Sequence, residues 1–175
     1  MIDDPLRLIS TGTGDAGFSS DYTGKRLAKA DALFEAMGTI DELSSWLGLC
    51  YHQIHDEGIK EIQRHLQRIN SQIATDPAHP HHAKLDLLGE AEVRWLENRE
   101  ADILSGMTLD HKFRLPGSET SAAGAFIDMG RAIARRAERQ FVAYRNSADR
   151  NDLLECGIYL NRLSDLLYLM ANKRT

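Results

Sequence analysis

The sequence predicts an all-α protein: a five-helix up-and-down bundle preceded by an irregular N-terminal loop. Beyond residue 30, apolar residues recur at spacings of three and four, which is the pattern of amphipathic helices. The segments with this pattern are long, their connections are short, and no convincing strand pattern lies between them. Long helices joined by short connections favour antiparallel neighbours. We therefore expect a single domain over 1–175, with the loop over 1–30 and the bundle over 31–175.

Apolar stripes place the first three helices. The first is predicted from Ala32 to His55, with a stripe of Leu33, Phe34, Met37, Ile40, Leu43, Leu47 and Cys50. Gly58 breaks the pattern, and the stripe of the second helix is Ile59, Ile62, Leu66, Ile69 and Ile73. Two prolines predict a loop over 75–82. The third helix is predicted from Leu87 to Leu104, with a buried stripe of Leu88, Ala91, Trp95 and Leu96.

Two further helices complete the predicted bundle. Pro116 and Gly117 identify 107–118 as a connection, because both residue types favour turns. The fourth helix is predicted over 118–145 and the fifth over 149–173. Asp149 is the predicted N-cap of the fifth helix, since a short carboxylate can accept hydrogen bonds from first-turn N–H groups.

Composition narrows the class of protein. The net charge of −5 at pH 7 argues against nucleic acid as the main partner, because phosphate backbones are bound by basic surfaces. No apolar run is long enough to span a membrane, and the N-terminus has no apolar signal core. Cys50 and Cys156 lack the spacing of metal ligands, so we expect two reduced thiols and a cytoplasmic protein.

Residues 12–17, Gly-Thr-Gly-Asp-Ala-Gly, match the dinucleotide-binding pattern G-x-G-x-x-G. That pattern functions after a strand and at the start of a helix, where the pyrophosphate reaches the helix N-terminus. The residues that follow, 18–24, are not helical in pattern, and no Gly-Lys-Ser/Thr ending supports a Walker-type loop. Two interpretations remain: a flexible N-terminal arm, or an irregular segment whose N–H groups cradle a phosphate.

Three arginines form a stripe on the fourth predicted helix. Arg131, Arg135 and Arg139 are spaced by four residues and therefore share one face. Like charges at this spacing repel each other, so the stripe needs nearby acids or an anionic ligand. Asp128 and Glu138 would make it an ordinary solvated face, whereas the planar guanidinium also suits phosphate oxygens.

The remaining polar residues give no metal site. A di-iron bundle needs two Glu-x-x-His pairs on facing helices, and the sequence contains none. The histidines at 52, 55, 79, 81 and 82 are interpreted as surface residues. Asp41 and Glu42 interrupt an apolar segment, and Asn161, Ser164 and Asp165 share one face of the last helix. Hydrogen bonds between helices would account for both groups.

Four stretches match one known family in their order. The first is Thr-Gly-Thr-Gly-Asp-Ala-Gly over 11–17, followed by Phe-Ser-Ser-Asp-Tyr-Thr-Gly-Lys-Arg, and the second is Phe-Glu-Ala-Met-Gly-Thr-Ile-Asp-Glu-Leu-Ser-Ser over 34–45. The third is Phe-Arg-Leu-Pro-Gly over 113–117, which leads into Arg-Ala-Ile-Ala-Arg-Arg-Ala-Glu-Arg over 131–139. The fourth is Tyr-Leu-Asn-Arg-Leu-Ser-Asp-Leu-Leu over 159–167. Together they resemble the PduO-type ATP:cob(I)alamin (corrinoid) adenosyltransferases. The resemblance spans nearly the whole chain.

The resemblance implies a homotrimer with ATP bound at each subunit interface. The residues matching those that wrap the triphosphate are Thr11, Gly14, Asp15, Gly17 and Lys25. Arg135 matches an arginine that contacts ATP, and Arg131 matches one that pairs across the interface with the acid at Asp41. Glu138 and Asn161 match further nucleotide-site residues. Phe113 matches the aromatic residue that covers the lower face of the corrin ring and excludes a lower axial ligand.

The implied activity is transfer of the 5′-deoxyadenosyl group of ATP to cob(I)alamin, giving adenosylcobalamin and triphosphate. Mg²⁺ on the phosphates, an electron-donating corrinoid reductase and a downstream adenosylcobalamin-dependent enzyme are the implied cofactor and partners. Three features depart from the family: Gly12 stands where a basic residue is usual, Ala16 replaces a residue that is often charged, and the stretch between Phe113 and Arg131 is slightly longer. In addition, the segment 79–110 has little resemblance to the family. A non-catalytic relative that stores or delivers cobalamin, and a trimeric scaffold, are therefore the alternatives.

Overall fold

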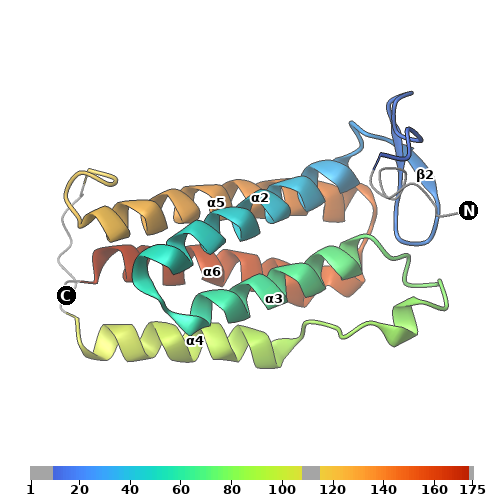
Figure 1. The fold of residues 1–175 in the computed structure, drawn as a ribbon. Helices are drawn as coiled ribbons and strands as arrows, with labels where there is room; N and C mark the ends of the chain where they lie inside the picture. The colour runs from blue at the N-terminus through green and yellow to red at the C-terminus, as the bar shows by residue number, and fades with distance from the viewer. Residues whose placement is uncertain (1–9, 108–114, 174–175) are drawn as a thin grey trace, which may run out of the picture.

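A computed structural model of the chain describes residues 10–107 and 115–173 (Figure 1). Within these ranges the long helices are α2 (Ala32–Ile54), α3 (Glu57–Ile73), α4 (Glu90–Ser105), α5 (Ala122–Ser147) and α6 (Leu154–Asn172). Two short strands, β1 (Phe18–Ser20) and β2 (Arg26–Ala28), precede them, and the 3-10 helices η1 (His82–Lys84) and η2 (Asn151–Leu153) lie in connections. Phe113 lies outside the described residues.

The five long helices form an up-and-down bundle, which confirms the predicted fold class. Each long helix runs antiparallel to the one before it (Figure 1). α2 packs against α3 and α5, while α6 packs against α5 and α4. The N-terminal strands lie at one end of the bundle, beside the start of α2 (Figure 1). No helix in the described ranges is long and apolar enough to cross a membrane.

The two strands were not predicted. β1 and β2 form an antiparallel hairpin in which Phe18 pairs with Ala28 and Ser20 with Arg26. Strands of three residues are too short to display an alternating pattern, and this sheet has only two of them. The hairpin matters for the site because it folds the chain after residue 20 back onto the glycine-rich segment.

Capping residues decide where the helices begin. The Asp31 carboxylate accepts a hydrogen bond from the Leu33 N–H at 2.9 Å, so α2 begins at the predicted residue. Asp56 likewise accepts from the Gly58 N–H at 2.8 Å, which places Gly58 inside the first turn of α3 instead of before it. The prediction for Asp149 is wrong. It adopts a left-handed φ of 52°, and α6 begins only at Leu154, after η2.

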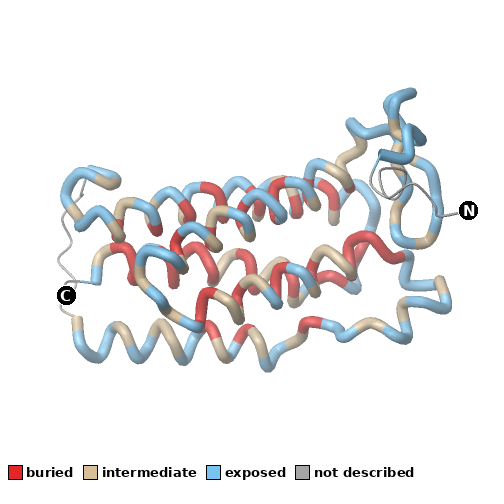
Figure 2. Tube along the Cα trace, viewed as in Figure 1, coloured by how far each residue is buried: buried red, intermediate tan, exposed pale blue. Residues whose placement is uncertain are grey.

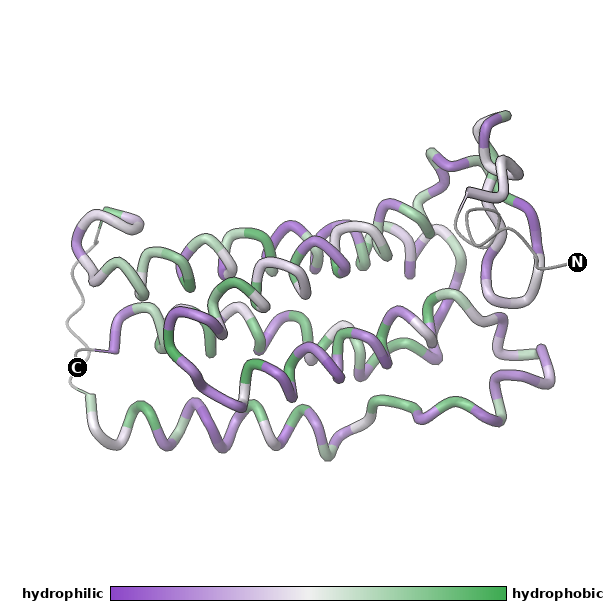
Figure 3. The backbone as a smooth tube through the Cα atoms, viewed as in Figure 1, coloured by the Kyte–Doolittle hydropathy of each residue, from purple (hydrophilic) through white to green (hydrophobic). Residues whose placement is uncertain are grey.

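The core lies along the facing sides of the helices (Figure 2), and hydrophobic residues follow those sides (Figure 3). The predicted stripes of α2 and α3 are buried with the exception of Phe34 and Met37, which are partly buried. On α4 the buried residues are Val93 and Leu96, while Ala91 is exposed and Trp95 is partly buried. α4 packs at the side of the bundle, so its apolar stripe is narrower than predicted.

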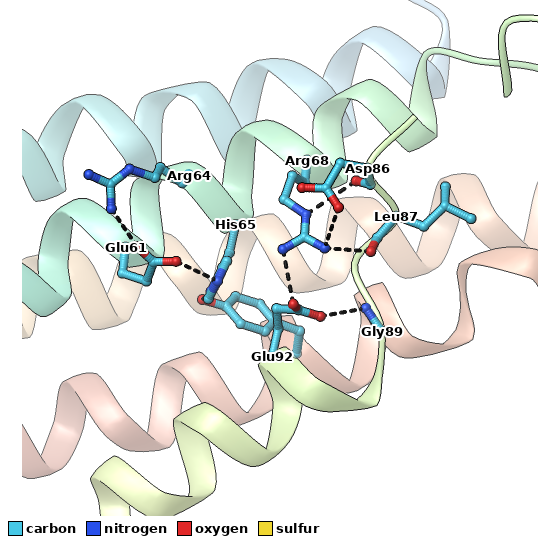
Figure 4. A network of polar contacts seen from close by, with 9 residues as sticks. Glu61, Arg64, His65, Arg68, Asp86, Leu87, Gly89 and Glu92 are labelled. Atoms are coloured by element: carbon cyan, nitrogen blue, oxygen red, sulfur yellow. Dashed lines mark hydrogen bonds and ion pairs between the residues drawn. The ribbon is translucent and has the colours of Figure 1, made fainter. Parts of the chain in front are cut away.

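A polar network joins α3 to the start of α4 (Figure 4). The Arg68 guanidinium donates to the carbonyls of Asp86 and Leu87 and to the Glu92 carboxylate, which lies 3.0 Å away. Glu92 in turn accepts from the Gly89 N–H at 2.8 Å and thereby caps α4. Burial opposes ionisation, but the Gly89 N–H and Arg68 hold the pKa of Glu92 below its ordinary value.

His65 is the buried member of this region, with 4% of its surface exposed. Its Nε2 lies 3.2 Å from the Glu61 carboxylate, and its Nδ1 lies 3.0 Å from the Tyr159 hydroxyl of α6. A carboxylate only accepts, so Nε2 carries the proton and Nδ1 accepts from Tyr159. Burial lowers the pKa of His65, although Glu61 and Glu92 act in the opposite direction and Arg68 adds to the lowering.

We expect His65 to make the fold sensitive to acid. Because its folded-state pKa lies below the unfolded value of 6.5, its contribution is present above pH 6.5 and is lost as pH falls below it. Melting temperatures between pH 8 and 5 should therefore fall more steeply for the wild type than for His65→Thr. Parallel profiles of the two proteins would contradict this role for His65.

Candidate functional site

The glycine-rich segment 11–17 forms two successive tight turns that leave most of its backbone exposed. The Asp15 N–H donates to the Gly12 carbonyl and the Gly17 N–H to the Gly14 carbonyl. Gly12 and Gly17 have φ values of +69° and +82°, which side chains rarely tolerate. Turns that mix these conformations can gather N–H groups around an anion. The segment runs into β1 and not into a helix, which confirms the rejection of a dinucleotide fold.

Residues of the hairpin and the chain just after it hold this segment. Arg26 of β2 donates to the Thr13 carbonyl at 3.0 Å, and the Lys29 N–H donates to the Gly17 carbonyl at 2.8 Å. The Lys29 Nζ lies 3.0 Å from the position that a Cβ on Gly14 would occupy. A side chain at Gly14 would therefore meet this ammonium group. Arg26 and Lys29 are therefore further candidates for the site, which were not singled out from the sequence.

Lys25 occupies a different place from Lys29. It lies in the turn of the hairpin, where its N–H donates to the Asp21 carboxylate at 3.0 Å. The register of the hairpin, with Ser20 opposite Arg26, carries the chain from that turn back to the glycine-rich segment. Position 29, and not position 25, consequently lies beside Gly14 and Gly17.

A second group of predicted residues lies between α5 and α6. The Asn161 amide donates to the Glu138 carboxylate at 2.9 Å, so two predicted nucleotide-site residues contact each other. The Arg162 guanidinium donates to the Asn161 carbonyl oxygen at 2.8 Å and fixes the orientation of the amide. Glu138 is thus not a counter-ion of the arginine stripe.

The arginine stripe is only partly neutralised within the chain. Arg131 pairs with Asp128 at 2.6 Å, one turn earlier on α5. Arg135 and Arg139 are exposed and make no ion pair with any described residue. Arg136, on a neighbouring face, pairs with Glu42 of α2. Within the described ranges, the Arg135 guanidinium is therefore exposed and without an acidic partner, which is what an anionic ligand requires.

Asp41 is also exposed, on the outer face of α2. It borders a hollow of about 430 Å³ between α2 and α3, whose lining includes Ser44, Arg64 and Asn70. In residues 10–107 and 115–173, no cation lies within ion-pair distance of Asp41. The predicted Asp41–Arg131 pair is thus not formed inside one chain.

The structure brings the predicted residues together in two separate groups. Thr11, Gly14, Asp15 and Gly17 share the N-terminal loop, while Glu138 and Asn161 meet at the α5–α6 face near Arg135. No hydrogen bond or ion pair between described residues connects the loop with Arg135. The described contacts of a single chain therefore do not join the two groups into one site.

Comparison with known proteins shows the family to which the chain belongs. The sequence model of the family described as Cobalamin adenosyltransferase matches residues 9–174. The chain belongs to the cobalamin adenosyltransferase family. The matched range includes the glycine-rich loop, the hairpin and the arginine stripe.

Named relatives agree with this membership. The chain is 35% identical over 167 residues to the corrinoid adenosyltransferase PduO of Salmonella typhimurium, covering 93% of this chain and 48% of that protein. It is 37% identical over 172 residues to the corrinoid adenosyltransferase MMAB of Mus musculus, covering 93% of this chain and 70% of that protein. The chain thus spans about half the length of PduO and about two thirds of MMAB.

Solved structures of this family share the fold. A phenylalanine-to-histidine variant of the PduO-type ATP:corrinoid adenosyltransferase from Lactobacillus reuteri, complexed with cobalamin and ATP, superposes with a TM-score of 0.82 at 29% identity. The alignment covers 94% of this chain and 89% of that one. An arginine-to-lysine variant of the same enzyme, complexed with ATP, gives a TM-score of 0.76.

Proposed function

We propose that this protein transfers the 5′-deoxyadenosyl group of ATP to the cobalt of cob(I)alamin, giving adenosylcobalamin and triphosphate. The observation that carries the proposal is the free guanidinium of Arg135, set beside the Glu138–Asn161 pair in a family of adenosyltransferases. The solved relatives with cobalamin and ATP bound support both molecules as substrates.

The reaction needs little covalent chemistry from the protein. Cobalt(I) is itself the nucleophile: its electron pair forms the bond to the 5′ carbon of ATP, and the carbon–oxygen bond breaks with triphosphate leaving. The protein must align the two substrates and neutralise the leaving triphosphate. Arg135 and the N–H groups of the N-terminal loop are suited to the second task, and Glu138 and Asn161 to orienting the nucleoside.

Mg²⁺ belongs with the triphosphate in this proposal. Mg²⁺ is usually held by substrate phosphates, waters and one or two carboxylates. Asp15 is an exposed carboxylate in the loop and fits that requirement. Phe113 is proposed to cover the lower face of the corrin ring, as the family resemblance implies.

A homotrimer would unite the two separated groups of site residues. We propose that Arg131 of one subunit pairs with Asp41 of the next, which brings the loop of one chain to Arg135 of another. Apolar side chains on the same two helices support an interface there: Leu49 on α2 is 52% exposed and Met129 on α5 is 50% exposed.

The loop cations can be ranked by substitution. Thr11, Gly14, Asp15, Gly17 and Lys25 remain proposed triphosphate contacts, and the structure adds Lys29. Since the Lys29 Nζ lies beside Gly14, we expect Lys29→Met to raise KM for ATP by about tenfold, the effect of losing a charge-assisted hydrogen bond. Lys25→Met should raise it less. Steady-state kinetics with varied ATP would show the order, and a larger effect at Lys25 would contradict it.

A lysine at position 12 would not simply restore the phosphate contact that is usual in the family. Its φ of +69° makes any side chain strained there, so restoring the family's usual basic residue would also disturb the turn. The Lys29 ammonium, close to Gly14, is a cation that can act in its place. This arrangement supports an active enzyme over a non-catalytic relative that stores or delivers cobalamin.

ATP binding separates the proposed enzyme from a trimeric scaffold. A ligand that binds only the folded state stabilises it by about 2.7 kcal/mol at 100 times its Kd, which corresponds to a rise in Tm of roughly 5 °C or more for a chain of this size. We expect MgATP to produce such a rise in a thermal melt. An unchanged Tm at millimolar MgATP would favour the scaffold.

We further propose a cytoplasmic location and two protein partners, a corrinoid reductase that supplies cob(I)alamin and an adenosylcobalamin-dependent enzyme that uses the product. The cysteines agree with a reducing compartment, because both are buried free thiols. Burial raises the pKa of Cys50 to about 11 and that of Cys156 to about 12, so neither acts as a nucleophile at neutral pH.

A further inference from the structure

The last turn of α3 ends in carbonyl groups that a helix cannot satisfy by itself. In this chain, donors from outside the helix reach three consecutive carbonyls. Those of Gln72 and Ile73 accept from the Arg150 guanidinium at 3.0 Å and 3.4 Å. The next carbonyl, that of Ala74, accepts from the Tyr22 N–H at 2.9 Å. The end of α3 is therefore shared between the bundle and the N-terminal hairpin.

Arg150 is held rigidly on the bundle side of this contact. Only 9% of its surface is exposed, and it forms a two-pronged ion pair with Asp152, in which both N–O distances are 2.8 Å. It also donates to the Tyr144 hydroxyl at 3.2 Å, and that hydroxyl lies 3.3 Å from the Ile73 carbonyl. Burial alone would lower the pKa of Arg150, but the bonds with Asp152 raise it and keep the guanidinium charged.

Tyr22 is on the hairpin side. It is the second residue of the turn Asp21–Gly24, in which the Gly24 N–H donates to the Asp21 carbonyl at 3.2 Å. Among the described residues, the Tyr22–Ala74 hydrogen bond is the one backbone hydrogen bond between segment 10–30 and the helices that follow α2. The hairpin also carries Arg26 and leads to Lys29, so its position sets where these cations meet the glycine-rich loop.

We propose that Arg150 is a positioning residue for the nucleotide loop: it fixes the last turn of α3 so that the Ala74 carbonyl can hold the hairpin in place. The catalytic consequence rests on the proposed adenosyltransferase function, whereas the structural link does not. Substrate-positioning groups act only when they are held in the right geometry, so a contact outside the site can affect ATP binding.

Amide hydrogen exchange tests the link directly. In Arg150→Met, residues 18–28 should lose protection while α2 keeps its own. Arg99→Met is the matched control, because Arg99 is also a partly buried arginine that pairs with Asp56, at the opposite end of α3, at 2.6 Å. The control should leave the hairpin unchanged. Equal protection of the hairpin in Arg150→Met and the wild type, or a loss spread evenly over all helices, would overturn the proposal.

A second pair of variants isolates the hydrogen bond itself. Tyr22→Pro removes the N–H at a turn position that accepts proline, while Tyr22→Ala removes the same ring and keeps the N–H. We expect Tyr22→Pro, relative to Tyr22→Ala, to raise KM for ATP about five- to tenfold with little change in kcat, as one lost hydrogen bond predicts. Arg150→Met should show the same split, and adding it to Tyr22→Pro should cause little further rise. Equal KM values for the two Tyr22 variants would also overturn the proposal.

The two proposals fail in different ways. A wild type that forms no adenosylcobalamin would refute the enzyme, yet exchange in the hairpin would still show whether Arg150 positions it. An active wild type whose hairpin does not respond to Arg150→Met would refute the positioning role alone. If Arg150→Met does not fold, Arg150→Lys, which keeps the charge but loses the two-pronged geometry, replaces it in both measurements.

Discussion

Replacing Arg135 with alanine should lower kcat for adenosylcobalamin formation by about 10²–10³-fold, the loss typical of removing one preorganised group from a developing negative charge. Arg135 is exposed on α5 and makes no ion pair with a described residue, so its removal leaves no buried charge unpaired. The variant should therefore fold and melt like the wild type. Rates under saturating ATP and cob(I)alamin measure the effect.

Two further variants make the Arg135 result specific. Arg135→Lys keeps the charge but loses the planar fork, so it should recover only part of the activity. Arg94→Ala is the matched surface control, because Arg94 is 63% exposed on α4 and its one ion pair among the described residues is with Glu90, one turn away. It should retain wild-type activity. Near-normal activity in Arg135→Ala would remove this arginine from the proposed triphosphate site.

The second large effect concerns assembly. Asp41→Arg should dissociate the proposed trimer, because it places two arginines where Asp41 and Arg131 are proposed to meet across the interface. Breaking one partner of a buried ion pair costs on the order of 3–5 kcal/mol, enough to separate subunits at micromolar concentration. The double variant Asp41→Arg/Arg131→Asp should restore the trimer, because it places opposite charges at the interface again. The restoration should be only partial, because Asp128 loses its Arg131 partner and meets a second carboxylate there. Sedimentation velocity distinguishes the species.

Glu42→Arg is the control for this charge reversal. Glu42 neighbours Asp41 but pairs with Arg136 of its own chain, and both side chains are about half exposed. Reversing such a surface pair should change stability by less than about 1 kcal/mol and leave assembly intact. A monomeric wild type, or an Asp41→Arg variant with unchanged mass in solution, would contradict the interface.

Local signals in the sequence were sufficient for the bundle. Apolar spacing placed all five long helices, and the predicted start of α2 agrees with the observed N-cap at Asp31, which acts within three residues of itself. The same reasoning failed at Asp149, where the chain first forms η2 and a left-handed residue. The connection between α5 and α6 is shaped by Arg150, whose partners at Gln72 and Ile73 lie almost 80 residues earlier. No local pattern contains that information.

The candidate site was likewise predicted in part from local sequence and in part depends on distant contacts. Motif order supplied the loop, the arginines of α5 and the pair Glu138 and Asn161, which do meet in the structure. The position of Lys29 was not predicted, because only the register of the β1–β2 hairpin brings Lys29, and not Lys25, next to Gly14. Three-residue strands leave no readable pattern, so this register had to be observed. Contacts between subunits join residues of different copies, so neither the sequence pattern nor the structure of one chain contains them.

The most direct test of the proposed function is an anaerobic spectral assay of the wild-type protein with MgATP and chemically generated cob(I)alamin, followed by illumination. The cob(I)alamin spectrum should be replaced by that of adenosylcobalamin, and light should then cleave the new cobalt–carbon bond. A spectrum that stays unchanged, with protein that is folded and binds ATP, would contradict the transfer reaction and favour a protein that stores or delivers cobalamin.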